Sequence, residues 1–379
     1  MAERFLWFLK VIYLIILSLP SPLRGQNKEL KFNDPGLKDQ WYLGKNAADD
    51  RHNNIWSAWQ QGATGKGVRI ALIDNGVEVT HNDLLDNIVT ESSFNYGDFN
   101  RDLQPRKTRT PGHGTKMAGI IGMSANNNQC GVGIAYEAKI SALTFGWTAL
   151  AHAQSYTHRL NETDIYVSTT GPPDNGQFIA KHTKQVMKAY VKGITKGRRG
   201  LGSIYIRTSG SGGYHGDHCG ADGTVNNLYS IAVASAAKDH SQTLLGEGCA
   251  SILTSVYTQQ TKWFVKGFTK DVITTDLKGS CTINSGGSST AAAMVSAIVA
   301  LALSVNQQLT WRDVQYLIIK SSNQNNLPVT WYTNGVGLRF NSRYGFGILD
   351  AGKMVTLSKT WKTTGVNMVS QKVLVTKSM

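Results

Sequence analysis

The stretch VRIALIDNG at residues 68–76 decides the fold class of this chain. It is a short apolar run that ends at an acidic residue, Asp74, and a turn. Its apolar residues follow one another without alternating with polar ones, which is typical of a parallel strand covered on both faces. Similar runs follow at residues 139–143, 165–168, 203–206 and 229–233. We therefore expect a mostly parallel sheet built from these runs.

Helical patterns lie between and after these runs, at residues 114–124, 178–194, 289–305 and 310–321. The last pattern begins with TWRD, residues 310–313, which is typical of a capping box at a helix start. Alternation of strands and helices predicts an α/β fold with a mostly parallel central sheet flanked by helices. Ligands bind such sheets at the carboxyl ends of the strands, so residues that directly follow strands are the best site candidates.

Three reactive side chains stand where strands or helices begin or end. Asp74 ends the first strand, His113 opens a helix in GHGTKMAG (residues 112–119), and Ser288 precedes a helix in SGGSSTAA (residues 285–292). Each alone has an ordinary structural explanation, as a turn aspartate, a helix-capping histidine or an N-cap serine. Together they supply a nucleophile, a base and an acid that orients the base. The start of a helix also offers free backbone N–H groups that can bind an oxyanion.

These motifs and several others resemble the catalytic domain of the furin/kexin branch of the subtilases, the proprotein convertases. The chain order Asp, His, Ser is the order in subtilisin. The further matching stretches are QWYL (40–43), NNNQCGVGIA (126–135), LGSI (201–204), LTWRDVQ (309–315) and YGFGILDA (344–351). The resemblance covers about residues 34–365. It implies a subtilisin-like three-layer fold and a serine endopeptidase that processes proproteins after basic residues, with Asp74, His113 and Ser288 as catalytic residues.

The two ends of the chain differ from this central part. Residues 1–25 carry Arg4 and Lys10 around a short apolar run, which predicts a signal peptide. The run is shorter than the roughly 20 residues that cross a bilayer, so we expect no stable membrane span. Residues 26–361 are expected to form the peptidase catalytic domain, followed by a short tail at residues 362–379. Neither the pro-segment nor the P domain of the convertases is expected in this chain.

The cysteines and a glycosylation sequon agree with a secreted chain. Four cysteines without a CxxC pair argue against a zinc site and suggest two disulfides, for which three pairings are open. The resemblance implies the bridges Cys130–Cys281 and Cys219–Cys249. The sequon at Asn161 would accept a glycan in the same oxidising compartment. We expect the lumen of the secretory pathway (endoplasmic reticulum or Golgi) or the extracellular space.

The net charge of +14 would ordinarily suggest a nucleic acid or an anionic membrane as partner. Much of it comes from lysines at helical spacing, with apolar residues on the opposite face: Lys181, Lys184, Lys188, Lys192 and Lys196. This pattern is typical of a solvated amphipathic helix. We therefore expect no nucleic-acid partner, and a basic peptide or proprotein as substrate.

The resemblance also implies calcium, because two sets of hard oxygen ligands match family sites. The first set comprises carboxylates, an amide and backbone carbonyls: Asp34, Asp83, the Asn127 side chain, and the carbonyls of Ser124, Gln129 and Gly131. The second comprises Asp174, Asp217 and Glu247, beside the pocket for the basic residue of the substrate. A third family site is degraded, because Asn95 and Asn100 replace carboxylates and only Asp102 remains.

The substrate-reading residues of the family are partly kept and partly lost. Asp174 and Asp222 match the acidic pair for the basic residue before the scissile bond. Neutral residues stand where the family has an acid or, at the last position, a tyrosine: Asn75, Thr110, His152, Ala180 and Thr224. A neutral side chain cannot pair with a buried Lys or Arg, so we expect a preference for a single basic residue.

The oxyanion position also departs from the family. Ser211, in TSGSGG at residues 208–213, stands where the family has an asparagine whose amide stabilises the tetrahedral intermediate. In subtilisin, a relative of this chain, losing that donor costs about 10²–10³ in turnover. Two functions follow: a calcium-dependent endopeptidase with reduced activity, or a catalytically impaired pseudoprotease that binds basic peptides or a convertase partner.

Overall fold

The structure is a computed structural model that describes residues 29–45, 49–108, 110–181, 183–261, 271–324 and 326–363. The chain divides into the units Met1–Leu30 and Lys31–Met379, and the described helices and strands belong to the second unit. The predicted signal peptide at residues 1–25 lies outside the described residues, as do residues 364–379 of the predicted tail.

The described residues form a nine-stranded central sheet with the order β10-β13-β7-β6-β5-β4-β1-β3-β2. Its strands are β1 (Arg69–Asp74), β2 (Phe94–Asn95), β3 (Lys139–Thr144), β4 (Ile165–Ser168), β5 (Ile204–Thr208), β6 (Ser230–Ala237), β7 (Ile252–Gln259), β10 (Ser322–Asn323) and β13 (Ile348–Leu349). Neighbouring strands pair in parallel, except for the antiparallel pair β10 and β13. The predicted apolar runs form β1, β3, β4, β5 and β6, which confirms the mostly parallel sheet.

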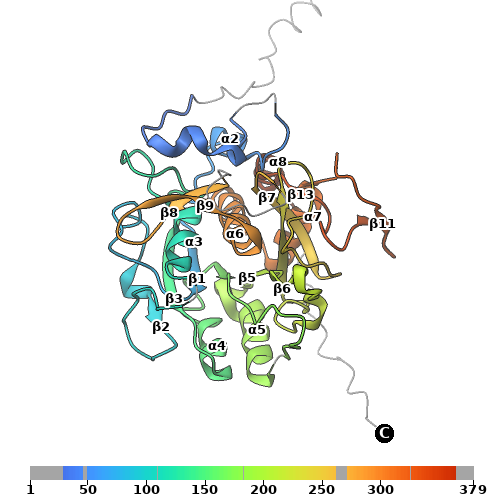
Figure 1. The fold of residues 1–379 in the computed structure, drawn as a ribbon, viewed down its shortest axis with the longest axis horizontal. Helices are drawn as coiled ribbons and strands as arrows, with labels where there is room; N and C mark the ends of the chain where they lie inside the picture. Colours follow the sequence, from blue (N-terminus) through green and yellow to red (C-terminus); the bar gives the residue numbers. More distant parts are fainter. Residues whose placement is uncertain are drawn as a thin grey trace, which may run out of the picture. The chain divides into compact units, whose positions relative to one another are not determined.

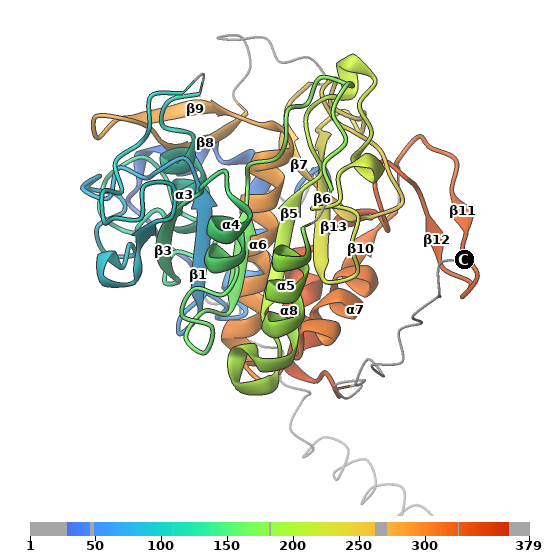
Figure 2. The same cartoon turned by 90° about the horizontal axis from the view of Figure 1, so that it is seen from below.

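Helices cover both faces of this sheet. They are α2 (Ile55–Gln60), α3 (His113–Gly122), α4 (Ala149–Ser155), α5 (Lys184–Lys196), α6 (Gly287–Val305), α7 (Trp311–Ser321) and α8 (Ala351–Lys359). Figure 1 shows α3 and α6 on one face of the sheet, with α4 and α5 on the other. Figure 2 shows α4 and α5 in front of the strands and α6 behind them. The fold is therefore the three-layer α/β arrangement that the resemblance implies.

The core helix α6 is apolar on all sides because it is buried on all sides. It is the one helix among the described residues with the length and hydropathy to cross a bilayer, and 83% of its apolar window is buried inside the protein. Its small residues, which include Ala291, Ala292 and Ala293, are fully buried. Small side chains let α6 approach the sheet and α3 closely, so its hydropathy is explained by core packing.

The lysine-rich helix α5 is amphipathic as predicted, but it is shorter than predicted. It begins at Lys184, whereas the pattern predicts a start at residue 178, because the Thr183 hydroxyl accepts a hydrogen bond from the Val186 N–H and caps the helix there. Tyr190 is fully buried and packs edge-on against Tyr205 of β5, with ring centroids 4.8 Å apart. The described lysines of α5 face outward, as a solvated helix requires.

Smaller elements complete the described part of the chain. Two antiparallel hairpins pair β8 (Val272–Thr275) with β9 (Cys281–Ser285), and β11 (Tyr332–Thr333) with β12 (Arg339–Phe340). The short 3₁₀ helices are η1 (Pro35–Asp39), η2 (Trp41–Leu43), η3 (Thr90–Ser92), η4 (Gly197–Gly200), η5 (Gly213–His215) and η6 (Cys219–Ala221). The disulfides are Cys130–Cys281 and Cys219–Cys249, the pairing that the resemblance implies. The first anchors the start of β9, the strand that leads into α6.

Candidate active site

Asp74 lies at the carboxyl end of β1 and is almost completely buried, with 1% of its surface exposed. Its carboxylate accepts hydrogen bonds from the backbone N–H of Asn75, at 2.7 Å, and from the Thr169 hydroxyl. These donors satisfy a charge that would be costly to bury unpaired. They also hold the carboxylate in one orientation beneath His113.

His113 is the first residue of α3, directly above this carboxylate. Its Nδ1 lies 2.9 and 2.8 Å from the two carboxylate oxygens of Asp74. Gly114 makes this approach possible, because a Cβ there would lie 2.2 Å from the carbonyl oxygen of Gly76. Burial disfavours the imidazolium, but attraction to Asp74 and the hydrogen bond with it prevail, so the pKa of His113 is raised. His113 therefore has the orientation and basicity of a general base.

Ser288 is the second residue of α6 and follows Gly287, whose φ of +83° lies in the left-handed region that favours glycine. Its Oγ lies 3.0 Å from the Oγ of Ser211. Among the described residues, no hydrogen bond joins Ser288 to His113. Both residues nevertheless line one open cleft of about 850 Å³. The structure thus brings the three predicted catalytic residues to one place, with the nucleophile turned toward Ser211.

Ser211 lies in the loop after β5. Its backbone N–H donates to Asp174 Oδ2 at 2.8 Å, and its hydroxyl shares the hydrogen bond with Ser288. The first N–H groups of α6 lack partners within the helix, as at any helix start. The structure places the Ser211 hydroxyl beside Ser288, and its role in binding an oxyanion stays a prediction.

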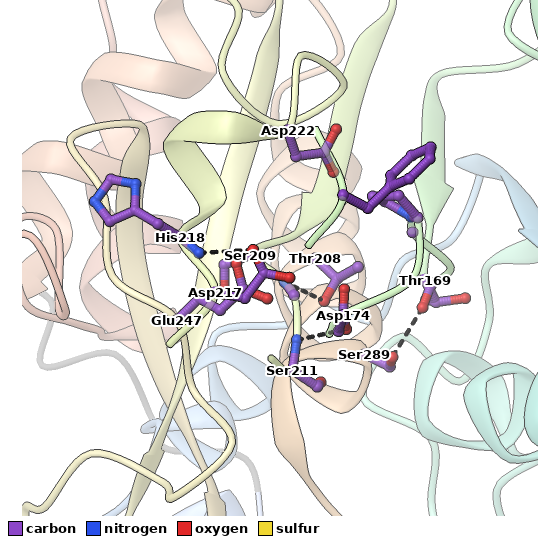
Figure 3. Close-up of a pocket in the computed structure, with 14 residues that line it drawn as sticks. Thr169, Asp174, Thr208, Ser209, Ser211, Asp217, His218, Asp222, Glu247 and Ser289 are labelled. Carbon is purple, nitrogen blue, oxygen red and sulfur yellow. Dashed lines mark hydrogen bonds between the residues drawn. The ribbon is translucent and has the colours of Figure 1, made fainter. Parts of the chain in front are cut away.

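An acidic pocket opens beside this point, and Figure 3 shows the side chains that line it. Asp174, Asp217 and Glu247 converge, with ligand oxygens within 4.8 Å of one another. In Figure 3 the carboxylate of Asp222 stands apart from these three. Backbone N–H groups orient the cluster, since Gly212 donates to Glu247 at 2.9 Å and Gly176 to Asp217 at 3.2 Å.

The electrostatics of this cluster favour a bound cation. Burial, followed by the negative charges of Asp174, Asp217 and Asp222, raises the pKa of Glu247 to about 7. Burial and the neighbouring Asp217 and Asp222 likewise raise the pKa of Asp174. A cation would relieve this repulsion, and carboxylate oxygens are the hard ligands that calcium takes. The residues predicted for the second calcium site therefore fit that ion.

Hydrogen bonds bring together five of the residues predicted for the first calcium site, namely Asp34, Asp83, Ser124, Asn127 and Gln129, whereas no hydrogen bond links the sixth, Gly131, to them among the described residues. Asp83 Oδ2 and Ser124 Oγ are buried and lack hydrogen-bond partners. Burial and the nearby Asp34 carboxylate raise the pKa of Asp83 to about 7. The Asn127 amide currently donates to Asp83 at 2.7 Å while its oxygen accepts from the Gln129 N–H, so it would ligate calcium only after turning over. The unpartnered carboxylate oxygen is the observation that fits a cation here.

In the loop of the third family site, which the sequence predicts to be lost, the positive charge comes from the side chain of Arg106. The Arg106 guanidinium lies 2.7 Å from Asp98 and 3.3 Å from the side-chain oxygen of Asn95. The Asp102 carbonyl accepts from the Asn95 amide at 2.9 Å, and the Asp102 carboxylate accepts from the Gln104 N–H at 3.1 Å. An arginine thus neutralises the loop for which the sequence predicts a lost calcium site.

The five neutral residues that the resemblance places at substrate-reading positions separate into two groups. Asn75 and Thr110 line the catalytic cleft. His152, Ala180 and Thr224 line a different cavity, together with the buried Arg207. Neither Arg207 nor Thr169 was predicted from the sequence. The backbone carbonyl of Thr169 accepts from the Ser289 hydroxyl at 2.8 Å, and the Thr169 hydroxyl donates to Asp74. No spacing in the sequence marks either residue, because both act through contacts with segments distant in the chain.

The predicted glycosylation residue, Asn161, lies exposed in a turn after α4. Thr163 of its sequon is buried and donates its hydroxyl to the His158 carbonyl at 3.1 Å. The asparagine itself is accessible, and its modification stays a prediction.

Comparison with known proteins identifies the class of protein that this fold and site define. Residues 65–347 match the model of the Subtilase family, and the chain belongs to that family. Solved structures agree in fold: the serine protease of Aeromonas sobria in complex with its chaperone covers 89% of this chain and 69% of its own, with a TM-score of 0.74 and 18% identity. A protease of Pseudoalteromonas arctica covers 87% of this chain and 100% of its own, with a TM-score of 0.68 and 20% identity.

Within that family the chain is similar to the catalytic domain of furin/kexin-type convertases. It is 39% identical to Furin-1 of Xenopus laevis over 88% of this chain and 42% of the relative. It is 38% identical to human Neuroendocrine convertase 2 over 88% of this chain and 54% of the relative. It is also 38% identical to human Proprotein convertase subtilisin/kexin type 6, over 89% of this chain and 35% of the relative. The chain thus spans about a third to a half of the length of these curated relatives.

Proposed function

We propose that this chain is a serine endopeptidase of the secretory pathway that depends on calcium and cleaves proproteins after a basic residue. The observation that carries the proposal is the hydrogen bonding of His113 to Asp74 at 2.8–2.9 Å beside a cleft that Ser288 also lines. Membership of the subtilase family supports the reaction class. The similarity to convertases supports the proprotein substrate and the secretory location.

In the proposed reaction, the Ser288 Oγ attacks the carbonyl carbon of the scissile bond and transfers its proton to Nε2 of His113. Asp74 holds the imidazole through Nδ1 and stabilises the imidazolium that forms. The Ser211 hydroxyl and backbone N–H groups at the start of α6 bind the oxyanion. His113 then donates the proton to the leaving amine, and water releases the acyl group from Ser288 in the reverse sequence.

The acidic pocket is where the basic residue would bind. Asp174 and Asp222 line it, and a Lys or Arg side chain there would relieve part of the repulsion among the carboxylates. Calcium, when bound to Asp174, Asp217 and Glu247, would supply positive charge that holds the loops of this pocket together. The first set, around Asp34 and Asp83, would hold calcium farther from the reaction.

A second function, a pseudoprotease that binds basic peptides or a convertase partner, is favoured by one observation. The Ser288 Oγ is hydrogen-bonded to Ser211, at 3.0 Å, and its base His113 is not a partner. A serine held in this way is not activated until the hydrogen bond is exchanged. The two functions differ in whether Ser288 is nucleophilic.

A serine-reactive fluorophosphonate probe separates these functions. The endopeptidase proposal expects labelling of the wild type, none of Ser288→Ala, and unchanged labelling of Ser304→Ala, a control on the same helix whose hydroxyl binds the Leu301 carbonyl. Equal labelling of the wild type and Ser288→Ala would remove Ser288 from its assigned role. A folded wild type that is not labelled would instead favour the pseudoprotease.

A further inference from the structure

A second cavity, of about 300 Å³, adjoins the catalytic cleft and has no role in the proposed reaction. It shares Phe145 and Trp147 with the cleft and Phe178 with the acidic pocket. A peptide lying in the cleft would therefore pass its mouth. Among the described residues that line this cavity there is no carboxylate, whereas Arg207 and Lys181 are present. Its charge is thus opposite to that of the acidic pocket next to it.

The charge at its wall comes from Arg207 of β5, which is buried, with 3% of its surface exposed. Its guanidinium donates to the Tyr156 hydroxyl at 2.5 Å and to the Thr224 hydroxyl at 2.7 Å, and Nε has no partner. Two of the five N–H groups that a guanidinium carries are therefore used. Both partners are neutral.

Arg207 makes no ion pair with any described residue. Arg198, the other buried arginine among the described residues, is paired with Asp164 at 3.1 Å. A buried cation without a counter-ion is costly, because the protein interior screens charge weakly. An anion that entered the cavity would therefore offset the free-energy cost of burying the charge of Arg207.

The surrounding titratable groups do not supply that anion. The charge of Asp222 acts on Arg207, but Thr224 links the two, since its hydroxyl donates to Asp222 at 2.7 Å while it accepts from Arg207. Burial, followed by the charge of Arg207, lowers the pKa of His152. Lys181 is exposed and adds positive charge at the rim.

We propose that this cavity is a substrate subsite for an acidic side chain, glutamate or aspartate, located upstream of the scissile bond, and that Arg207 determines this specificity. The inference rests on the proposed function, since the peptide is held by its basic residue in the acidic pocket. A carboxylate would form charge-assisted hydrogen bonds with the unused N–H groups of Arg207. A lysine or arginine at the same position would meet a like charge in a weakly screening environment.

The test measures peptide binding in the Ser288→Ala protein, so that it does not depend on catalysis. Fluorescent peptides carry one arginine before the scissile bond and glutamate, glutamine or lysine at each upstream position in turn. At one position we expect glutamate to bind about tenfold more tightly than glutamine, equivalent to about 1.4 kcal/mol, and lysine to bind most weakly. Fluorescence anisotropy gives the dissociation constants.

Variants locate the effect. Arg207→Gln in the same background should abolish the preference for glutamate while the glutamine peptide still binds. Lys192→Gln, on the exposed face of α5, removes one charge elsewhere and should leave the preference unchanged. Melting curves show whether Arg207→Gln is folded, and if it is not, the three peptides on the parent protein decide alone.

The outcomes separate the two proposals. Binding of glutamate and glutamine peptides with equal affinity at every position overturns the assignment of Arg207, while the proposed function stands. Failure of every peptide to bind contradicts the proposed function and this inference together.

Discussion

Ser288 and Ser211 are the pair of residues on which activity depends. Their hydroxyl oxygens are 3.0 Å apart and form a hydrogen bond in which either hydroxyl can be the donor. The hydroxyl of Ser211 can both donate to and accept from the hydroxyl of Ser288, so Ser211 is bonded to the nucleophile itself. We expect this contact to weaken both the activation of Ser288 and the stabilisation of the oxyanion.

Restoring an amide donor should therefore raise activity. Ser211→Asn should increase kcat by about 10²-fold, because the longer amide both releases Ser288 and donates to the oxyanion. Hydrolysis of a peptide with a single arginine gives kcat. Ser211→Ala is the matched control, since it releases Ser288 without adding a donor, and it should gain much less. An unchanged rate in folded Ser211→Asn would place the defect elsewhere.

The Asp74–His113 pair predicts the pH dependence of activity. The base must be neutral, and Asp74 raises the pKa of His113 above its ordinary value of about 6.5. Activity should consequently fall as the pH decreases, with a midpoint above pH 6.5. A profile of kcat/KM against pH measures it. Asp74→Asn should reduce kcat by about 10⁴-fold and move the acidic limb to lower pH, whereas a limb below pH 6 in the wild type would contradict the assignment.

At the scale of elements, the site depends on how helices begin. The hairpin β8–β9 delivers the chain to the start of α6, and the disulfide Cys130–Cys281 anchors that hairpin. The start of α7 is fixed by a capping box, in which the Thr310 hydroxyl donates to Asp313 and accepts from the Asp313 N–H. Asp313 also accepts from Trp361 at 3.0 Å, and so attaches the segment after α8 to α7.

Removing either residue of this capping box should lower the stability of the protein, by a different amount for each. Thr310→Ala should reduce the free energy of unfolding by about 1 kcal/mol, the ordinary value for an N-cap. Asp313→Ala should cost more, because the donors of Trp361 and Thr363 lose their acceptor. Denaturant unfolding measures both, with the exposed Lys320→Ala as control. A smaller effect of Asp313→Ala than of Thr310→Ala would contradict this order.

The same residue makes stability sensitive to acid. Burial favours the neutral form of Asp313, but the hydrogen bonds from Thr363, Trp361 and Thr310 prevail and lower its pKa to about 2. A lowered pKa in the folded state gives stability that is present above about pH 4 and is lost as the pH falls toward 2. Asp313→Asn should flatten stability across this window, and an identical slope in the two proteins would exclude Asp313 as its source.

At the scale of the whole molecule, calcium would join loops that are far apart in the sequence. Asp34, Asp83 and Asn127 come from three different segments, and Asp34 Oδ2 already accepts the Asn126 N–H at 2.9 Å. Asp83 is fully buried with one carboxylate oxygen unpartnered. Without a cation, this charge destabilises the fold, and with one it becomes a cross-link.

Removal of calcium should therefore lower the melting temperature, whether or not the protein is active. An ion at 100 times its dissociation constant contributes about 2.7 kcal/mol of stability. Asp83→Asn should remove the part of the response that comes from this site and leave the part that comes from Asp174, Asp217 and Glu247. In the presence of a chelator this variant should be at least as stable as the wild type, because it lacks the unpaired charge, and with calcium it should be less stable. Calorimetry with calcium, magnesium or chelator tests the expected order of stability both with and without calcium. A melting temperature of the wild type that does not change with calcium would contradict the proposed calcium site.

The sequence alone indicated five strands of the sheet (β1, β3, β4, β5 and β6), four helices (α3, α5, α6 and α7) and the three catalytic candidates, for a local reason, whereas β7 (Ile252–Gln259) and the helices α2, α4 and α8 were not predicted. Successive apolar residues, as in β1, require burial on both faces, and an aspartate or serine at the end of such an element is placed by the parallel sheet. The start of α5 was predicted six residues too early, because the apolar pattern extends beyond the cap at Thr183, where the helix begins.

Only the tertiary structure decided which partners these residues have. Two hydrogen bonds of the site join segments that are distant in the chain: Ser288 with Ser211, and Thr169 with Asp74. Arg207 likewise bonds Tyr156 from a distant segment, while its Nε has no partner. Such contacts depend on sheet register and side-chain direction, which leave no spacing in the sequence. Residue type therefore determined which chemistry is available, and packing decided whether each charge and hydroxyl is paired, because pairing is a property of neighbours in space.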